Sequence, residues 1–273
     1  PIGDGQRGLK VAGNRRTAEV ELIPGRSTIS AVAVTEQEYR SKPDRVHVRY
    51  EGASAESKLY VLAIGIDKYK NGSYNLNYAT TDAKALVQEI QNKAESIFEN
   101  IEVSYISDSE ATKEKVQQTI NAIRQQARPQ DMFLFYYAGH GVMSQGSPTK
   151  PGDFYLALHD VTQLYGSDQM LADRGISAAE LREAFGDIDA RKQLIVLDAC
   201  QSGGAVETFA MRGAAEEKAM IQLARSTGIT LLASTGTEQF ATEFEQLGHG
   251  VFTYSILEGM SGEADGGSGD GKI

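Results

Sequence analysis

The chain has 273 residues and a formal net charge of −10, and 41% of its residues are hydrophobic. That length suits one large globular domain, or one domain with an additional fragment. The acidic balance argues against binding to nucleic acid, which depends on clustered Lys and Arg, and it is compatible with basic substrates. Because no apolar run approaches the roughly 20 residues of a membrane helix, we expect no membrane contact in this fragment.

Cys200 is the only cysteine in the sequence. A single cysteine excludes an intramolecular disulfide and a multi-cysteine zinc site, and a free thiol fits a reducing compartment. The cytoplasm is therefore the default localisation, which is otherwise unknown. The chain starts without an initiator Met and stops inside the Gly-rich "GEADGGSGDGKI", so we expect flanking domains of a longer chain.

The segment 1–57 is predicted to be β structure. Three short alternating stretches have the pattern of strands, namely "RTAEVELIP", "STISAVAVT" and "RVHVRYEG", and the turn signal "PGRS" lies between the first two. The small and polar "EGASAESK" that follows is typical of a linker. Three strands are few for a complete domain, and the pattern resembles the end of an Ig-like domain.

Strands and helices are predicted to alternate over residues 58–273. Strand-length apolar runs occur at 59–66, 101–106, 132–138, 193–199 and 229–234. Three of these runs are nearly continuous, which suits parallel strands that are buried on both faces. Such an alternation predicts a three-layer α/β domain built around a mainly parallel sheet.

Helical patterns lie between these strands. Apolar residues at helical spacing form one stripe within 79–90 and another within 116–127. Ser177 and Glu180 have the spacing of a capping box, which predicts a helix start at this point. The stretch "GVFTYSILEGM" is predicted to form the last helix.

Two reactive side chains follow two of the buried strands. His140 stands in a predicted Gly-His-Gly turn after "FLFYYA", and Cys200 follows "LIVLDA". Taken alone, a cysteine at a strand end is usually a small core residue, and a histidine in a Gly-rich turn is usually a loop residue. In parallel sheets, however, functional groups gather beyond the carboxyl ends of the strands. The joint placement therefore favours a thiol nucleophile with an adjacent base.

The motifs "YYAGHG" and "LDACQSGG" resemble the paired histidine and cysteine motifs of caspase-fold cysteine peptidases, most closely those of the bacterial metacaspase-like branch, the orthocaspases. The stretch "LYVLAIGIDKYKNGSYNLNYATTDAKAL" resembles the first strand, loop and helix of that family, and the likeness runs from about Leu59 to Gly262. The resemblance implies a caspase-like α/β fold with a mainly parallel six-stranded sheet. It also implies a Cys–His dyad that cuts peptide bonds without a cofactor.

By this resemblance, Cys200 attacks the peptide carbonyl and forms a thioester with the acyl group. His140 is expected to protonate the leaving amine and then to activate the water that completes the reaction. The N–H groups of Cys200 and Gly141 are expected to form the oxyanion hole. The sequence names no third member of a catalytic triad.

Three acids are candidates for the S1 pocket, which holds the residue before the cleaved bond. Asp198 lies two residues before the nucleophile, so on an extended strand both side chains point to one side. Asp82 matches the pocket acid of metacaspases, and Glu243 matches an acid of the related paracaspases. The plainer interpretations are a first-turn acid that the helix dipole favours for Asp82, and a solvated surface charge for Glu243.

An acidic pocket predicts protein or peptide substrates that are cleaved after Arg, less well after Lys, and not after Asp. Two residues depart from the metacaspase pattern: Ala138 stands where Ser is frequent, and Ala79 stands where Cys is frequent. The subsite preference therefore stays open. A catalytically silent caspase-like scaffold or binding module is the alternative function, but the presence of the dyad and of the acids favours an active enzyme.

Self-processing is expected in the segment after the nucleophile. Arg212, Lys218 and Arg225 suit an acidic pocket, and Arg212 is preferred because Gly213 offers an accessible backbone. The strong helix propensity of "AAEEKAMIQLA" supports an ordinary helix instead.

Calcium is considered as an activator, because many metacaspases need it. Asp265 and Asp270 lie in a loop that faintly resembles a calcium loop, although it lacks the full ligand spacing, and a plain polar loop explains it as well. No metal ligand is assigned. His159 and His249 are expected to be structural, because no metal-ligand spacing links them.

Overall fold

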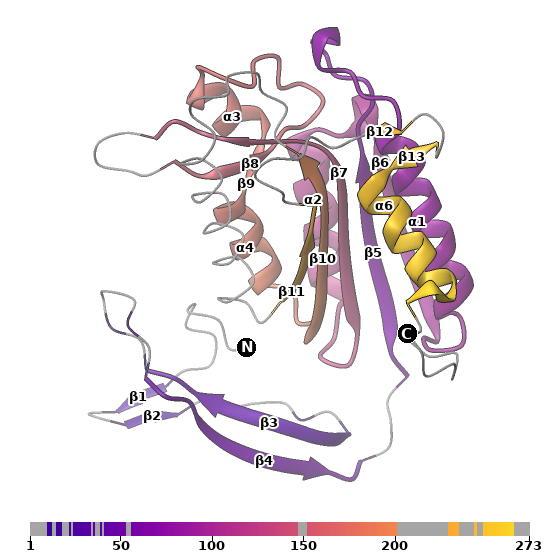
Figure 1. Ribbon diagram of the computed structural model, residues 1–273. Helices are drawn as coiled ribbons and strands as arrows, with labels where there is room; N and C mark the ends of the chain where they lie inside the picture. The colour runs from indigo at the N-terminus through magenta and orange to yellow at the C-terminus, as the bar shows by residue number, and fades with distance from the viewer. Residues whose placement is uncertain are drawn as a thin grey trace.

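A computed structural model of the protein (Figure 1) describes residues 10–12, 15–17, 22, 24–33, 35, 39, 41–52, 56–146, 152–200, 229–234, 243–244 and 248–264. Within these residues the predicted α/β architecture is confirmed. A central parallel sheet lies between two layers of helices (Figure 1).

The central sheet contains five parallel strands, and each corresponds to one of the predicted apolar runs. They are β5 (Lys58–Gly65), β6 (Asn100–Ser107), β7 (Met132–Met143), β10 (Lys192–Cys200) and β11 (Thr230–Ala233), in the order β11-β10-β7-β5-β6. The strands β5 and β7 are buried along nearly their whole length, as continuous apolar runs predict. The resemblance implies a mainly parallel six-stranded sheet, and the described residues form a sheet of seven strands, of which these five are parallel.

Two short strands extend the sheet alongside the last residues of β7. The strand β8 (Phe154–Leu156) pairs antiparallel with β7, and β9 (Ile176–Ser177) pairs with β8. As a result, β7 continues through the stretch that was predicted to be a turn. The prediction of a Gly-His-Gly turn is wrong, because pairing on both sides of His140 keeps the backbone extended.

Each face of the sheet carries its own layer of helices. On one face, α1 (Ala79–Ala94) and α6 (Val251–Glu258) pack against apolar side chains of β5 and β7. On the other face lie α2 (Lys113–Gln126), α3 (Asp168–Arg174) and α4 (Ala178–Gly186). Short helical turns at Gly72–Tyr74, Asp108–Glu110 and Gly259–Glu263 complete the helical elements of the part of the chain that the structure describes. The predicted last helix is thus confirmed as α6.

The predicted start of α4 is also confirmed. The Glu180 N–H donates to Ser177 Oγ at 3.1 Å, and the Ser177 N–H donates to Glu180 Oε2 at 2.8 Å. These reciprocal bonds are a capping box, which satisfies N–H groups that a helix start otherwise leaves without partners.

The N-terminal segment forms two antiparallel hairpins. They consist of β1 (Lys10–Ala12) with β2 (Arg15–Thr17), and β3 (Gly25–Ala31) with β4 (Asp44–Tyr50). The apolar side chains of Ile29 and Val46 on the second hairpin are exposed. The Ig-like assignment and the domain boundary after residue 57 stay predictions. Across the described residues, no helix is both long and apolar enough to cross a membrane.

Candidate active site

The two predicted dyad residues are neighbours in the sheet. Cys200 ends β10, and its register partner on the adjacent parallel strand β7 is His140. Neighbouring strands lie about 5 Å apart, so the two backbones run side by side at this point. The pairing places both residues at the carboxyl edge of the sheet, as the sequence predicted. The side chain of Cys200 lies outside what the structure describes.

The imidazole of His140 is held in one orientation by a main-chain carbonyl. Its Nε2 lies 2.7 Å from the carbonyl oxygen of Tyr74, and the residue is only 5% exposed. Because a carbonyl oxygen can only accept, Nε2 must carry the proton of this bond. In the neutral ring the basic lone pair is therefore on Nδ1. A main-chain carbonyl has no sequence signature, so the sequence could not name this partner.

A buried tyrosine also supports His140. The ring of Tyr69 lies 4.9 Å from the His140 ring between centroids, and the His140 backbone N–H donates to the Tyr69 hydroxyl at 2.9 Å. Burial raises the pKa of Tyr69, so its hydroxyl stays neutral. Tyr137 adds a hydrogen bond from its hydroxyl to the carbonyl oxygen of Ala157 at 2.7 Å. These contacts fix the backbone on which the imidazole is mounted.

Gly141, a predicted oxyanion donor, follows His140 on β7. It is opposite Leu156 in β8, while the preceding ladder bond runs from the Ala157 N–H to the His140 carbonyl oxygen at 2.9 Å. Antiparallel ladder bonds alternate, so the Gly141 N–H is directed away from β8. A Cβ at this position would lie 2.6 Å from the Phe154 ring, which explains the glycine.

The structure brings together two of the three predicted S1 acids. Asp82 lies in the first turn of α1 and Asp198 lies on β10. A Cβ built on Gly250 would lie 2.9 Å from Asp82 Oδ2 and 3.3 Å from Asp198 Oδ2. The two carboxylates therefore lie close to one another at Gly250, which is packed against both. We call this pair of carboxylates the acidic pocket.

The carboxylates of the acidic pocket are poorly solvated. Burial raises the pKa of Asp82 to about 6, and the hydrogen bonds from His249 and from the Gly250 N–H oppose the rise. Burial also raises the pKa of Asp198, against a hydrogen bond from Thr253. The Thr253 hydroxyl donates to Asp198 Oδ2 at 2.6 Å, so its contact with Tyr136 must use the Tyr136 hydroxyl as the donor.

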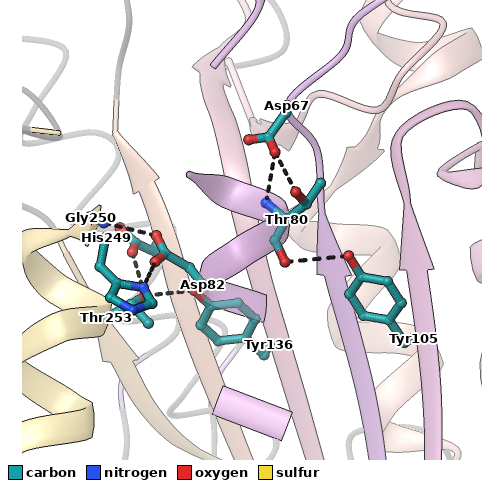
Figure 2. Close-up of polar contacts among 9 residues, drawn as sticks. Asp67, Thr80, Asp82, Tyr105, Tyr136, His249, Gly250 and Thr253 are labelled. Carbon is teal, nitrogen blue, oxygen red and sulfur yellow. Dashed lines mark hydrogen bonds and ion pairs between the residues drawn. The ribbon is translucent and has the colours of Figure 1, made fainter. Parts of the chain in front are cut away.

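The first turn of α1, which carries Asp82, is fixed to the sheet. Asp67 Oδ2 accepts from the Thr80 N–H at 3.3 Å and also from the Thr80 hydroxyl, and the Tyr105 hydroxyl donates to the Thr80 carbonyl at 3.3 Å (Figure 2). Gly65 allows close contact, because a Cβ there would lie 2.4 Å from the Ala79 carbonyl oxygen. These contacts set the position of the Asp82 side chain.

His249 was expected to be structural, but it contacts the acidic pocket. The strand β13 (His249–Gly250) pairs with β12 (Glu243–Phe244), which places the backbone of Glu243 opposite Gly250. The side chain of Glu243 lies outside the described part of the chain. His159, by contrast, contacts the Lys68 carbonyl through Nδ1 at 2.5 Å, in a loop.

Several predicted residues fall outside the described ranges. They are the autocleavage candidates Arg212, Lys218 and Arg225 and the calcium-loop acids Asp265 and Asp270. In the part of the chain that the structure does describe, no three His, Cys, Asp or Glu residues are grouped to hold a metal ion.

Comparison with known proteins identifies a matching protein family. Residues 58–268 match the peptidase family model described as "Caspase domain". The crystal structure of protein GSU0716 from Geobacter sulfurreducens matches with 18% identity and a TM-score of 0.52, over 75% of this chain and 82% of that chain. This likeness shows the fold alone.

Two further comparisons add no functional information. A mutant of the PilB minor pilin from Streptococcus sanguinis matches with 9% identity and a TM-score of 0.38, over 78% of this chain and 63% of that chain, which is too distant to support an inference. No curated protein matches the chain.

Proposed function

Because the chain belongs to the caspase-domain family of cysteine peptidases, we propose that it is an endopeptidase that cleaves after Arg, and less well after Lys. The observation that carries the proposal is the pairing of Cys200 with His140 at a sheet edge that also carries Asp198, two residues before the cysteine. A nucleophile, a base and an anionic subsite then lie at one edge. The orthocaspase branch remains part of this proposal.

The reaction proceeds in two steps. Nδ1 of His140 takes the proton of the Cys200 thiol, and the thiolate attacks the peptide carbonyl, whose oxyanion is held by the N–H groups of Gly141 and Cys200. The imidazolium then returns its proton to the leaving amine, and a thioester forms. The bond from Nε2 to the Tyr74 carbonyl stabilises that imidazolium. In the second step His140 activates the water that hydrolyses the thioester.

The acidic pocket explains the choice of Arg. A guanidinium carries five N–H donors in a planar fork and stays charged at any physiological pH, so it pairs well with two carboxylates. A Lys ammonium is a point charge and satisfies fewer acceptors. An Asp side chain would add a third carboxylate to two that are already poorly solvated, and repulsion would exclude it.

The test uses matched fluorogenic peptides that differ only in having Arg, Lys or Asp before the cleaved bond. We expect turnover in the order Arg, Lys, Asp, and none in a Cys200→Ala variant. Each assay is run with calcium and with a chelator, because calcium activation is part of the proposal. If no peptide is cleaved under either condition, the domain is a silent scaffold or binding module and the proposal is wrong.

Self-processing is proposed for the segment that contains Arg212, Lys218 and Arg225. Each offers the basic side chain that the acidic pocket accepts. Intact-mass spectrometry of the active protein beside Cys200→Ala should find a cut after one of these residues, and after Arg212 first, in the active protein alone. An uncut active protein that still cleaves Arg peptides would contradict self-processing.

A further inference from the structure

The acidic pocket is occupied by a neighbouring segment of the same chain. His249 Nδ1 lies 2.7 Å from Asp82 Oδ1, and the Gly250 N–H donates to Asp82 Oδ2 at 3.0 Å. The Thr253 hydroxyl bonds Asp198. Figure 2 shows His249, Gly250 and Thr253 gathered around Asp82, with Tyr136 beside Thr253. Both oxygens of Asp82 are therefore engaged before any substrate arrives.

We propose that His249 is a specificity-determining residue that pairs with Asp82 in place of the basic side chain of the substrate, and gives way when Arg binds. This inference rests on the proposed function. The side chain of His249 is 24% exposed and that of Asp82 is 4% exposed. The imidazole therefore lies on the solvent side of the carboxylate, where an entering side chain meets it first.

The displacement of His249 from Asp82 by a substrate side chain favours Arg for a chemical reason. The imidazole offers one N–H to Asp82, and it is charged only when it is protonated. A guanidinium is always charged and, once His249 gives way, can donate to Asp82 and Asp198 together, since oxygens of both carboxylates lie close to the same point beside Gly250. Arg thus replaces one contact by several, whereas an uncharged side chain of similar length gains nothing from displacing His249. A substrate side chain therefore has to bind Asp82 more strongly than His249 does in order to displace it.

The contact can be removed without touching the dyad. In His249→Ala the imidazole is absent and Asp82 Oδ1 loses its internal partner, so an entering guanidinium no longer has to compete. In His249→Asn an amide N–H can still reach the carboxylate, so competition is kept. His47→Ala is the matched control, because His47 is exposed on the β3–β4 hairpin, where its ring contacts the Thr28 hydroxyl at 3.0 Å.

The experiment compares KM for two matched peptides, one with Arg and one with norleucine before the cleaved bond. His249→Ala should lower the ratio of the Arg KM to the norleucine KM about two- to fivefold, the range expected for loss of a partly exposed ion pair. His249→Asn and His47→Ala should keep the ratio of the unmodified protein. Calorimetry of the Arg peptide on Cys200→Ala, with and without His249→Ala, should show the same change in Kd.

The outcomes separate the two proposals. An unmodified protein that neither cleaves nor binds the Arg peptide in preference to norleucine refutes the proposed function, and this inference with it. Arg-specific cleavage with a KM ratio that is unchanged or higher in His249→Ala overturns the inference alone, because His249 would then hold Asp82 in place for the substrate. Thermal unfolding of each variant shows whether the fold is intact.

Discussion

The ionisation of Asp82 makes arginine selectivity depend on pH. Burial raises the pKa of this carboxyl from 3.8 to about 6, so in the folded protein it is neutral below that pH and gains its charge as the pH rises through it. About one tenth of the carboxyls are ionised at pH 5 and about nine tenths at pH 7. The preference for an Arg peptide over an uncharged peptide, measured as a ratio of kcat/KM values, should therefore rise up to about tenfold between pH 5 and pH 7.

The assay must separate the ionisation of Asp82 from the titration of the dyad. We propose to measure kcat/KM for matched peptides with Arg or with citrulline, which has a similar shape without the charge. The dyad acts on both peptides, so the ratio of their kcat/KM values isolates the effect of the pocket charge. That ratio should rise with pH through about 6 and should flatten in Asp82→Asn. In His249→Ala its midpoint should move to higher pH, because the His249 contact lowers the pKa of Asp82.

Two results would refute this reasoning. The first is a ratio that does not change between pH 5 and pH 7 in the unmodified protein. The second is a pH step that persists unchanged in Asp82→Asn, which would assign it to another group. Asp198 is the nearest such group, because burial raises its pKa in the same direction, and Asp198→Asn identifies its share.

Three further substitutions test the site and the fold. Tyr69→Phe removes the acceptor of the His140 N–H, and urea denaturation should show a loss of about 1–3 kcal/mol of unfolding free energy; an unchanged midpoint would contradict this role. Gly141→Ala places a methyl group against Phe154, so the backbone N–H of residue 141 should shift from its position and kcat should fall by up to about a hundredfold, the cost of losing the contact of one oxyanion donor; a near-normal kcat would mean that the backbone at residue 141 keeps its position in spite of the methyl group. Ser177→Ala removes the capping bond of α4 and should cost about 1 kcal/mol, measured by denaturation, with peptide turnover retained; an undiminished stability would mean that the cap contributes little.

The strands were the most predictable part of the fold. Runs such as "LYVLAIGI" and "QLIVLDA" are apolar at nearly every position, and only burial on both faces of a sheet accommodates that pattern. The structure places β5 and β10 within one residue of the predicted limits. The end of β7 was not predictable, because Gly139 and Gly141 indicate a turn locally. Pairing with β8 and β10, which the residues around His140 do not reveal, overrides that local signal.

The candidate site also contains some residues that the sequence could predict and others that it could not. The motifs around His140 and Cys200 could be recognised because a strand, a reactive side chain and small flanking residues follow one another in sequence. The Tyr74 carbonyl and the His249 imidazole could not be recognised, since neither carries a local pattern. His249 is 167 positions from Asp82 in sequence, and only the packing of α6 beside α1 brings the two together. Contacts of this kind belong to the tertiary fold.

The change of partner along β7 makes one amide a reporter of the active site. β7 pairs with its parallel neighbour β10 as far as His140 and with its antiparallel neighbour β8 from Gly141 onward, and the Ala157 N–H bonds the His140 carbonyl oxygen at 2.9 Å. Opening of β8 would release that amide to solvent and would loosen the backbone that carries the imidazole. The hydrogen-exchange rate of Ala157 therefore measures how often the catalytic base loses its support, without a substitution at any reactive residue.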